Sequence, residues 1–295
     1  MFFVGAEGLV IDQFGRVLLI QRDDSRTWAL PGGGLDVNEL PTMGMAREVF
    51  EETGYKVHPI RLTQVSYIRG REQDLLIFVV RGMLRGGSSQ TSAESLQVAF
   101  METDRLPTMH PSHRERLQTN LNHPGGPPVL QQQERLSWPW RIMRRLVYQV
   151  KDVQRWWRDL PRYVPPTPWQ IEAVVVIANE KGQVLWQEKS GQWGLPGGPC
   201  PLGTPPWVAA AHHAQTQLRT PVTLTDLAGV YVAPTNRMTL CFVGKLGKGA
   251  AAGRWATVEE VGDAAADNTH LFIQDALCLH EATQFRTIAP PMPQT

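Results

Sequence analysis

Three features are scarce in this 295-residue chain: cysteine, long apolar runs and an excess of charge of one sign. The three cysteines, Cys200, Cys241 and Cys278, are an odd number and show no CxxC spacing. This pattern argues against both a disulfide framework and a zinc site. A reducing compartment fits best, and we expect the protein to be cytoplasmic.

Membrane insertion and bulk electrostatic attraction are also disfavoured. The longest apolar runs, Leu75 to Val80 and Ala173 to Ala178, are far too short to cross a bilayer. Glu7 interrupts the apolar amino terminus, which has no basic segment, so we expect a soluble and unprocessed chain. The 29 basic and 28 acidic residues give a net charge of +1, so nothing global attracts nucleic acid or an anionic membrane. Any charge effect must therefore be local.

The chain repeats itself. Residues Gly8 to Gly33 parallel Val174 to Gly198, with Gly15 matched by Gly182 at a spacing of 167 and Gly33 by Gly198 at 165. Two copies of one fold are the simplest account, and the length and 42% hydrophobic content suit two domains. We expect a first domain over 1–123, a linker over 124–169, a second domain over 170–287 and a flexible tail over 288–295.

Local composition predicts the elements of each copy. Residues 2–11 and 16–21 read as a β-hairpin around the turn 12–15. A helix should run over 40–53 and end at Gly54, a residue that favours the position after a helix. The further elements expected are strands at 61–68, 75–84, 96–101, 229–232 and 239–246, helices at 113–121 and 268–282, and a stretch at 254–261 that matches 98–106 of the first copy.

The linker carries apolar residues at helical spacing over 136–164, and its opposite face is basic. Such a segment could contact nucleic acid, lipid headgroups or a protein partner. We favour the plainer interpretation, an amphipathic linker helix that packs on the domains with its arginines in water.

Three carboxylates share one face of the helix predicted over 40–53. Glu48, Glu51 and Glu52 fall within roughly a 100-degree arc at about 100 degrees per residue. They repel one another and lie near the negative end of the helix dipole, a cost that a structural role does not explain. Bound Mg²⁺ or Mn²⁺ would explain it, because hard cations prefer carboxylate oxygens. Arg47 precedes Glu51 by four residues and can pair with it.

The loop before this helix supplies Gly32, Gly33 and Gly34. Glycines let the main chain turn sharply or approach a phosphate closely. Alone they are weak evidence, but Gly33, Glu39, Arg47, Glu48, Glu51, Glu52 and Gly54 stand at fixed spacings.

This arrangement resembles the signature of the Nudix hydrolase family at every Gly, Glu and Arg position. The one departure is Tyr55, where the family usually has an aliphatic residue. The resemblance implies a fold of class α/β (α+β): tandem Nudix-like α/β/α sandwiches around mixed sheets, joined by a helical linker. It also implies Mg²⁺-dependent hydrolysis of a diphosphate linked to a nucleoside or another group, with Mn²⁺ as an alternative cation.

Carried over residue by residue, the resemblance makes Glu48, Glu51 and Glu52 metal ligands, one of which could also be the base that activates water. It implies that Arg47 orients them and that Glu39 belongs to the outer network. Family members often recruit one more glutamate; Glu94 is our candidate, with Glu72 and Asp74 as rivals. Arg22 resembles a recurrent contact to the substrate phosphate, and an ordinary surface arginine is an equal alternative.

The second copy lacks this chemistry. Its aligned helix has no Asp or Glu from Gly198 to Arg219, so it cannot assemble the same oxygen-rich cation site. The residues that replace Glu39, Arg47, Glu48, Glu51, Glu52 and Gly54 are Thr204, His212, His213, Thr216, Gln217 and Arg219. We therefore expect a degenerate Nudix-like copy.

Two functions remain open on the sequence. The first is a hydrolase of a small nucleoside diphosphate derivative, which we favour; the second is a protein that senses a nucleotide or binds a partner, with little catalytic activity. A homodimer is left open and nucleic acid is not an expected partner. Phe2, Phe3, Trp28 and Tyr67 could stack on a base, although aromatic residues near strands more often belong to the core.

Overall fold

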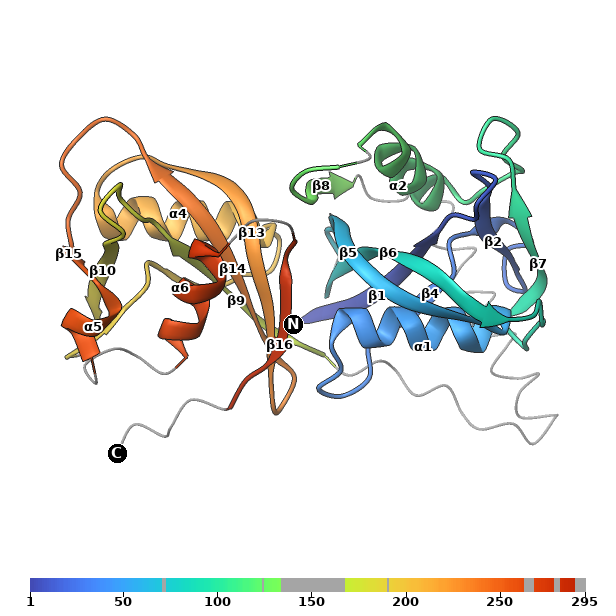
Figure 1. The fold of residues 1–295 in the computed structure, drawn as a ribbon, viewed down its shortest axis with the longest axis horizontal. Coiled ribbons are helices and arrows are strands. Elements are labelled where there is room, and N and C mark those ends of the chain that lie inside the picture. Colours follow the sequence, from blue (N-terminus) through green and yellow to red (C-terminus); the bar gives the residue numbers. More distant parts are fainter. Residues whose placement is uncertain are drawn as a thin grey trace.

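The chain forms two α/β halves, each built on a five-stranded mixed sheet (Figure 1). The computed structural model describes residues 1–70, 73–123, 125–133, 168–189, 191–262, 268–278 and 282–289. Among these residues no helix has the length and apolar character needed to span a membrane. The predicted helix over 136–164 and the end of the predicted tail lie outside the described residues.

The sheet of the first half has the strand order β4-β1-β6-β5-β8. Its strands are β1 (Phe2–Val10), β4 (Gly32–Gly34), β5 (Tyr55–Ile68), β6 (Asp74–Gly87) and β8 (Val129–Gln133). The pairing is mixed, since β1 runs parallel to β6, whereas β5 runs antiparallel to β6. Strand β8 pairs with β5 although it lies beyond residue 123, so the first sheet continues into the segment expected to be linker.

The predicted amino-terminal hairpin is wrong in its pairing. Both strands exist, and β2 (Val17–Arg22) follows the expected turn. However, the two strands do not form a ladder with each other: one isolated bridge joins Ile11, just after β1, to Val17. Strand β2 instead joins a three-stranded sheet with β3 (Trp28–Ala29) and β7 (Ser95–Met101). Both edges of β1 are already taken by β4 and β6, so the chain changes sheets at the turn.

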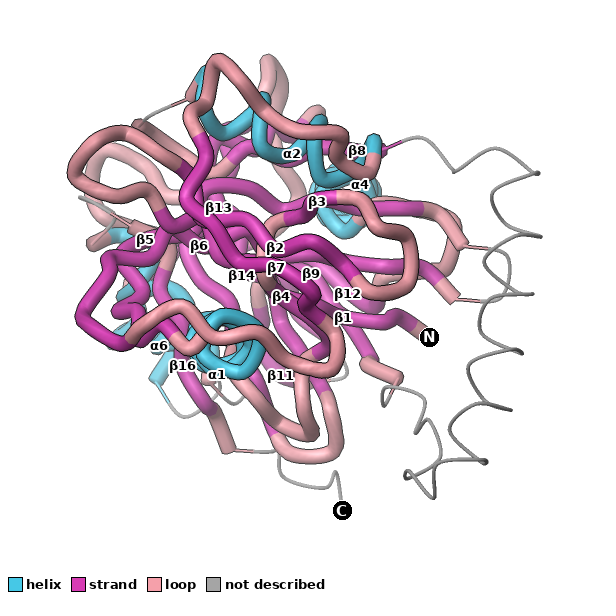
Figure 2. The backbone as a smooth tube through the Cα atoms, turned by 90° about the vertical axis from the view of Figure 1, so that its right-hand side faces the viewer, coloured by secondary structure: helices cyan, strands magenta, loops and turns pink. Residues whose placement is uncertain are grey.

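Two helices cover opposite faces of the first sheet (Figures 1 and 2). Helix α1 (Pro41–Thr53) buries Met45 and Val49 in the core and ends at Gly54, whose φ of 72° is left-handed, as predicted. Helix α2 (Pro111–Asn122) packs Leu117 into a separate cluster on the other face. These two layers make the first half an α/β/α sandwich.

The second half repeats this plan in the order β12-β9-β14-β13-β16, beside a three-stranded sheet β11-β10-β15. Its elements are β9 (Gln170–Val176), β10 (Val184–Lys189), β11 (Gln192–Gly194), β12 (Gly197–Pro199), α4 (Pro206–Leu218), β13 (Val222–Ala233), β14 (Arg237–Leu246), β15 (Arg254–Ala256), α5 (Val258–Val261), α6 (Thr269–Leu277) and β16 (Gln284–Thr287). The predicted stretch 254–261 is therefore a short strand followed by a helical turn.

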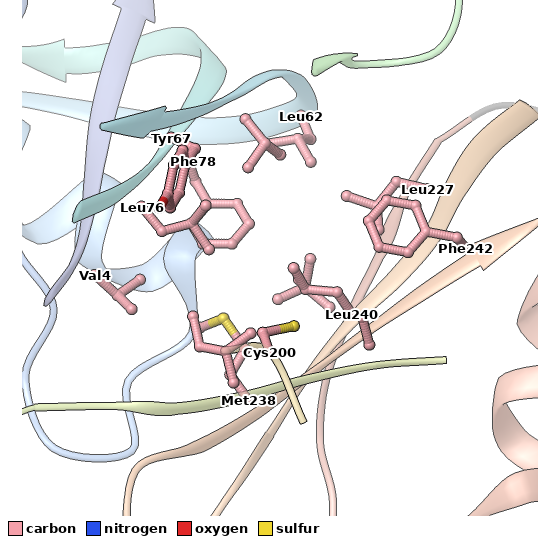
Figure 3. Packing of buried hydrophobic residues seen from close by; sticks show 14 of the residues in the cluster. Val4, Leu62, Tyr67, Leu76, Phe78, Cys200, Leu227, Met238, Leu240 and Phe242 are labelled. Carbon is pink, nitrogen blue, oxygen red and sulfur yellow. The ribbon is translucent and has the colours of Figure 1, made fainter. Parts of the chain in front are cut away.

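The two halves share one hydrophobic core. Figure 3 shows Leu76 and Phe78 of the first half facing Leu240 and Phe242 of the second, within a single cluster of buried residues. At the same boundary Phe2 and Trp169 exchange two backbone hydrogen bonds of 3.0 and 2.8 Å. The second half thus covers an apolar surface of the first.

Candidate active site

The three glutamates of α1 differ in exposure. The Glu51 side chain is 56% exposed and that of Glu48 is 14% exposed, whereas Glu52 is buried. The buried Glu52 is held in place, because the Gly32 N–H donates to its Oε2 at 2.8 Å. This bond joins the end of the helix to the glycine loop.

The glycines form strand β4 rather than an open loop, and they bring the backbone against the carboxylates. Gly32 has a φ of 153° and lies against Ala6 and Glu7 of β1. A Cβ atom on Gly33 would lie 2.6 Å from the Glu48 carboxylate, so a side chain there would displace it. Glycine is therefore required for this approach, while contact of the loop with a phosphate stays a prediction.

Arg47 is the centre of the carboxylate network. Its Nε and Nη2 donate to the two Glu39 oxygens, both at 2.9 Å, and its Nη1 donates to Glu48 at 2.9 Å and to Glu51 at 3.2 Å. The Gly34 carbonyl accepts a further bond at 3.0 Å. One guanidinium therefore fixes the relative positions of the loop, Glu39 and two glutamates of the helix.

Burial makes the site unfavourable for uncompensated negative charge. Desolvation raises the pKa of Glu48, although the adjacent Arg47 opposes the shift. Desolvation, with smaller contributions from the charges of Glu48 and Glu94, raises the pKa of Glu52 to about 8 against the lowering effect of the Gly32 N–H. A cation among these groups would be electrostatically stabilised.

The structure brings Glu94 to the carboxylates. The negative charge of Glu94 raises the pKa of both Glu48 and Glu52, and the neighbouring Ser95 Oγ donates to the Glu52 carbonyl at 2.6 Å. Arg22 is also close enough for its charge to lower the pKa of Glu52, and it makes bonds of 3.0 and 2.8 Å to Asp24.

The rivals of Glu94 are placed differently. Asp74 is buried at the boundary between the halves, where its carboxylate accepts from the Tyr67 hydroxyl at 2.8 Å and from the Gly203 N–H at 2.6 Å. Its oxygens are engaged there, away from α1. Glu72 lies outside the described residues. The aromatic candidates Phe2, Trp28 and Tyr67 are buried core residues.

The donor set suits a hard cation. Within the described part of the chain, no three His, Cys, Asp or Glu side chains are already arranged to hold a metal. However, Glu48 Oε2, Glu51 Oε1 and Glu52 Oε1 make no hydrogen bond to described residues, since Arg47 and Gly32 engage the other oxygen of each. Carboxylate oxygens are the ligands that Mg²⁺ and Mn²⁺ prefer.

Sequence reasoning missed a buried polar cluster beside Gly32. Arg116 of α2 is 1% exposed; its Nε donates to Glu7 at 2.8 Å and its Nη1 to Gln133 at 2.7 Å. His113 Nδ1 lies 3.4 Å from Glu7, and burial lowers the His113 pKa well below its usual value. Glu7, a charge in an otherwise apolar strand, was the available signal, but nothing local identified its partners.

Two of the aligned residues of the second half bond to the backbone of its own glycine loop. Gln217, in the place of Glu52, accepts from Gly197 N at 3.0 Å and donates to Gly197 O at 2.8 Å. His213, in the place of Glu48, donates through Nε2 to the Pro199 carbonyl at 3.0 Å. This half keeps the contact between loop and helix without the carboxylates.

The comparisons with known proteins concern the first half. A family model described as the NUDIX domain matches residues 1–119. A MutT-like protein of Streptomyces ambofaciens is 40% identical over 35% of this chain and 66% of its own length. A putative ADP-ribose pyrophosphatase and a putative 8-oxo-dGTP diphosphatase of Bacillus subtilis are each 29% identical, over 53% and 77% of their own lengths. The chain thus spans about half to three quarters of these relatives.

Among solved structures, a NUDIX hydrolase from Nitrosomonas europaea aligns with 45% of this chain and 79% of its own, with 24% identity and a TM-score of 0.39. The sequence matches and the complete signature around Arg47 agree with each other. Residues 1–119 therefore form a NUDIX domain.

Proposed function

We propose that the first half hydrolyses a diphosphate linkage in a nucleoside diphosphate derivative, using Mg²⁺ or Mn²⁺. The observation that carries the proposal is the Arg47 network, which holds Glu39, Glu48 and Glu51 beside the buried Glu52. The relatives named as ADP-ribose pyrophosphatase and 8-oxo-dGTP diphosphatase support this substrate class.

In the proposed reaction, a water oxygen attacks one phosphorus and the bond from that phosphorus to the bridging oxygen breaks. The proton of the water passes to one of Glu48, Glu51 and Glu52. A bound cation would neutralise the diphosphate and lower the pKa of the attacking water. Arg47 holds the carboxylates in fixed relative positions, and we propose that Arg22 contacts a substrate phosphate.

We propose that the second half is a degenerate Nudix-like domain without this activity. Its strand order repeats that of the first half, and Gln217 and His213 satisfy the backbone that faces them. No Asp or Glu occurs from Gly198 to Arg219 to bind a cation or accept a proton.

The test is a panel of nucleoside diphosphate derivatives incubated with Mg²⁺ and the full chain, with release of nucleotide and phosphate measured. Replacement of Glu51→Gln together with Glu52→Gln should abolish hydrolysis, whereas Glu102→Gln, on an exposed loop, should not. Full activity in the double variant would refute the site. Nucleotide binding without turnover by the wild type would instead favour the sensing function.

A further inference from the structure

We propose that Asn236 of the second half is a positioning residue for the carboxylate network of the first half. The inference rests on the proposed function, because it gives the degenerate half a role in that site. The Asn38 N–H donates to Asn236 Oδ1 at 2.9 Å, and the Asn236 N–H donates to Asn38 Oδ1 at 3.0 Å. The two residues are 198 positions apart in the chain.

The contact is built on two uncommon backbone conformations. Asn38 has a φ of 60° and Asn236 a φ of 55°, in the left-handed region that asparagine tolerates better than most residues. Asn236 is 4% exposed although it lies in the turn between β13 and β14, and its carbonyl also accepts from Gln170 N at 2.9 Å. The second half thus offers a fixed anchor to the loop of the first.

On the other side of the contact, Asn38 lies inside the turn that carries Glu39. The Glu39 N–H donates to the Asp36 carbonyl at 3.1 Å, and the Asp36 N–H donates back to the Glu39 carboxylate at 2.9 Å. Asn38 is the left-handed third residue of this turn. Fixing Asn38 therefore fixes the direction from which Glu39 reaches Arg47.

Arg47 links the position of Glu39 to the positions of Glu48 and Glu51 on the helix. Glu39 binds both Nε and Nη2 of its guanidinium, and the remaining Nη1 binds Glu48 and Glu51. Helix α1 offers no replacement for the anchor, because Leu40 at its amino end makes no side-chain cap. The path from the second half to the carboxylates therefore consists of directly bonded groups.

The related contact across the boundary leads to no carboxylate network. Gly203 matches Asn38 at the spacing of 165, and its N–H donates to Asp74 near the hairpin between β5 and β6. The residue after Gly203 is Thr204, where the first half has Glu39. Both contacts hold the halves together, and one of them also supports the site.

The experiment measures Mn²⁺ affinity by the electron paramagnetic resonance signal of free Mn²⁺, together with kcat and KM on the best substrate of the panel. Asn236→Gly removes the side chain but keeps the left-handed backbone accessible. Loss of one such contact, worth about 1 kcal/mol, should weaken Mn²⁺ binding about fivefold and lower kcat more than it raises KM. Asn236→Asp keeps the acceptor oxygen and should restore most of the affinity.

The matched control is Thr235→Gly, in the same hairpin turn, also left-handed at a φ of 66° and exposed. It should bind Mn²⁺ like the wild type. Asn38→Gly removes the second bond of the pair, which the Asn236 N–H donates, so it should also weaken Mn²⁺ binding. The double variant with Asn236→Gly loses both bonds and should bind Mn²⁺ more weakly than either single variant. Unfolding temperatures of all variants separate loss of folding from loss of positioning.

Wild-type Mn²⁺ affinity in Asn236→Gly, or an equal loss in Thr235→Gly, would overturn the inference. Wild-type Mn²⁺ affinity in the double variant, which lacks both bonds, would also overturn it. A wild-type chain that binds Mn²⁺ but hydrolyses no substrate would refute the proposed function instead, so the two failures are distinguishable.

Discussion

Replacement of Arg47 by lysine tests the carboxylate network most directly. The guanidinium makes five hydrogen bonds at once, reaching Glu39 on one side and Glu48 and Glu51 on the other. A lysine ammonium has three donors on one nitrogen, so at least two of the five bonds must be lost. The total charge of the site is unchanged.

The size of the effect follows from these lost bonds. Charge-assisted hydrogen bonds contribute about 1.5 to 3 kcal/mol each, and the 26% exposure of the Arg47 side chain reduces that figure through solvent screening. Two weakened bonds of this kind amount to about 1.5 kcal/mol, or roughly tenfold in kcat/KM. We expect Mn²⁺ affinity to fall in parallel, because Glu48 and Glu51 lose their common partner.

The assay is steady-state hydrolysis at saturating Mg²⁺, with unfolding temperature measured on the same samples. Arg16→Lys is the matched control, since Arg16 also pairs with a carboxylate, Asp12, through Nε at 2.8 Å and Nη2 at 2.7 Å. It lies in the turn before β2 and should leave kcat/KM unchanged. If Arg47→Lys retained activity within about twofold of the wild type, the bidentate contacts could not be what positions the glutamates.

Three further predictions concern sterics, pH and the boundary between the halves. Gly33→Ala should abolish most hydrolysis in a folded protein, because its Cβ would lie 2.6 Å from the Glu48 carboxylate. Gly198→Ala should leave activity unchanged, because its Cβ would meet His213 at an ordinary 3.5 Å. Equal activity of the two variants would contradict this account. Desolvation and the charges of Arg116, Arg22 and His110 lower the pKa of His113, whose side chain is 14% exposed, despite the nearby Glu7. The imidazole therefore stays neutral in the folded state but gains a proton in the unfolded state below about pH 6.5. The free energy of unfolding should therefore fall by about 1 kcal/mol as the pH drops from about 7.5 to about 5.5. In denaturant titrations, His113→Gln should reduce this dependence on pH, whereas His58→Gln, at an exposed position, should not. Asp74→Asn should destabilise the protein by about 2 kcal/mol, because the buried carboxylate accepts from three donors, whereas exposed Asp104→Asn should change the unfolding midpoint little.

The sequence was informative wherever the cause of a structure is local. Helix α1 ends at Gly54 because a residue without Cβ accepts the left-handed conformation there. The face shared by Glu48, Glu51 and Glu52 follows from helical geometry alone. For the same reason the spacing of Arg47 and Glu51 correctly predicted their contact.

Long-range contacts could not be obtained in this way. Strands β1 and β2 were located correctly, but their partners depend on which segments cover the core, and composition does not encode that choice. The contact between Asn38 and Asn236 joins two turn residues with ordinary local signals. Similarly, Glu7 stood out in its strand, while its partner Arg116 lies 109 residues away.

The two halves separate the architecture of the glycine loop from its chemistry. Gly32 and Gly197 have φ angles of 153° and 151°, and each N–H donates to the residue that ends the carboxylate face, Glu52 or Gln217. An amide makes this bond as well as a carboxylate does, and Gln217 adds a second bond to the Gly197 carbonyl. Folding of the loop therefore requires an acceptor but no charge. The buried carboxylate at Glu52, which desolvation disfavours, is therefore not required by the fold, and the proposed reaction would account for it.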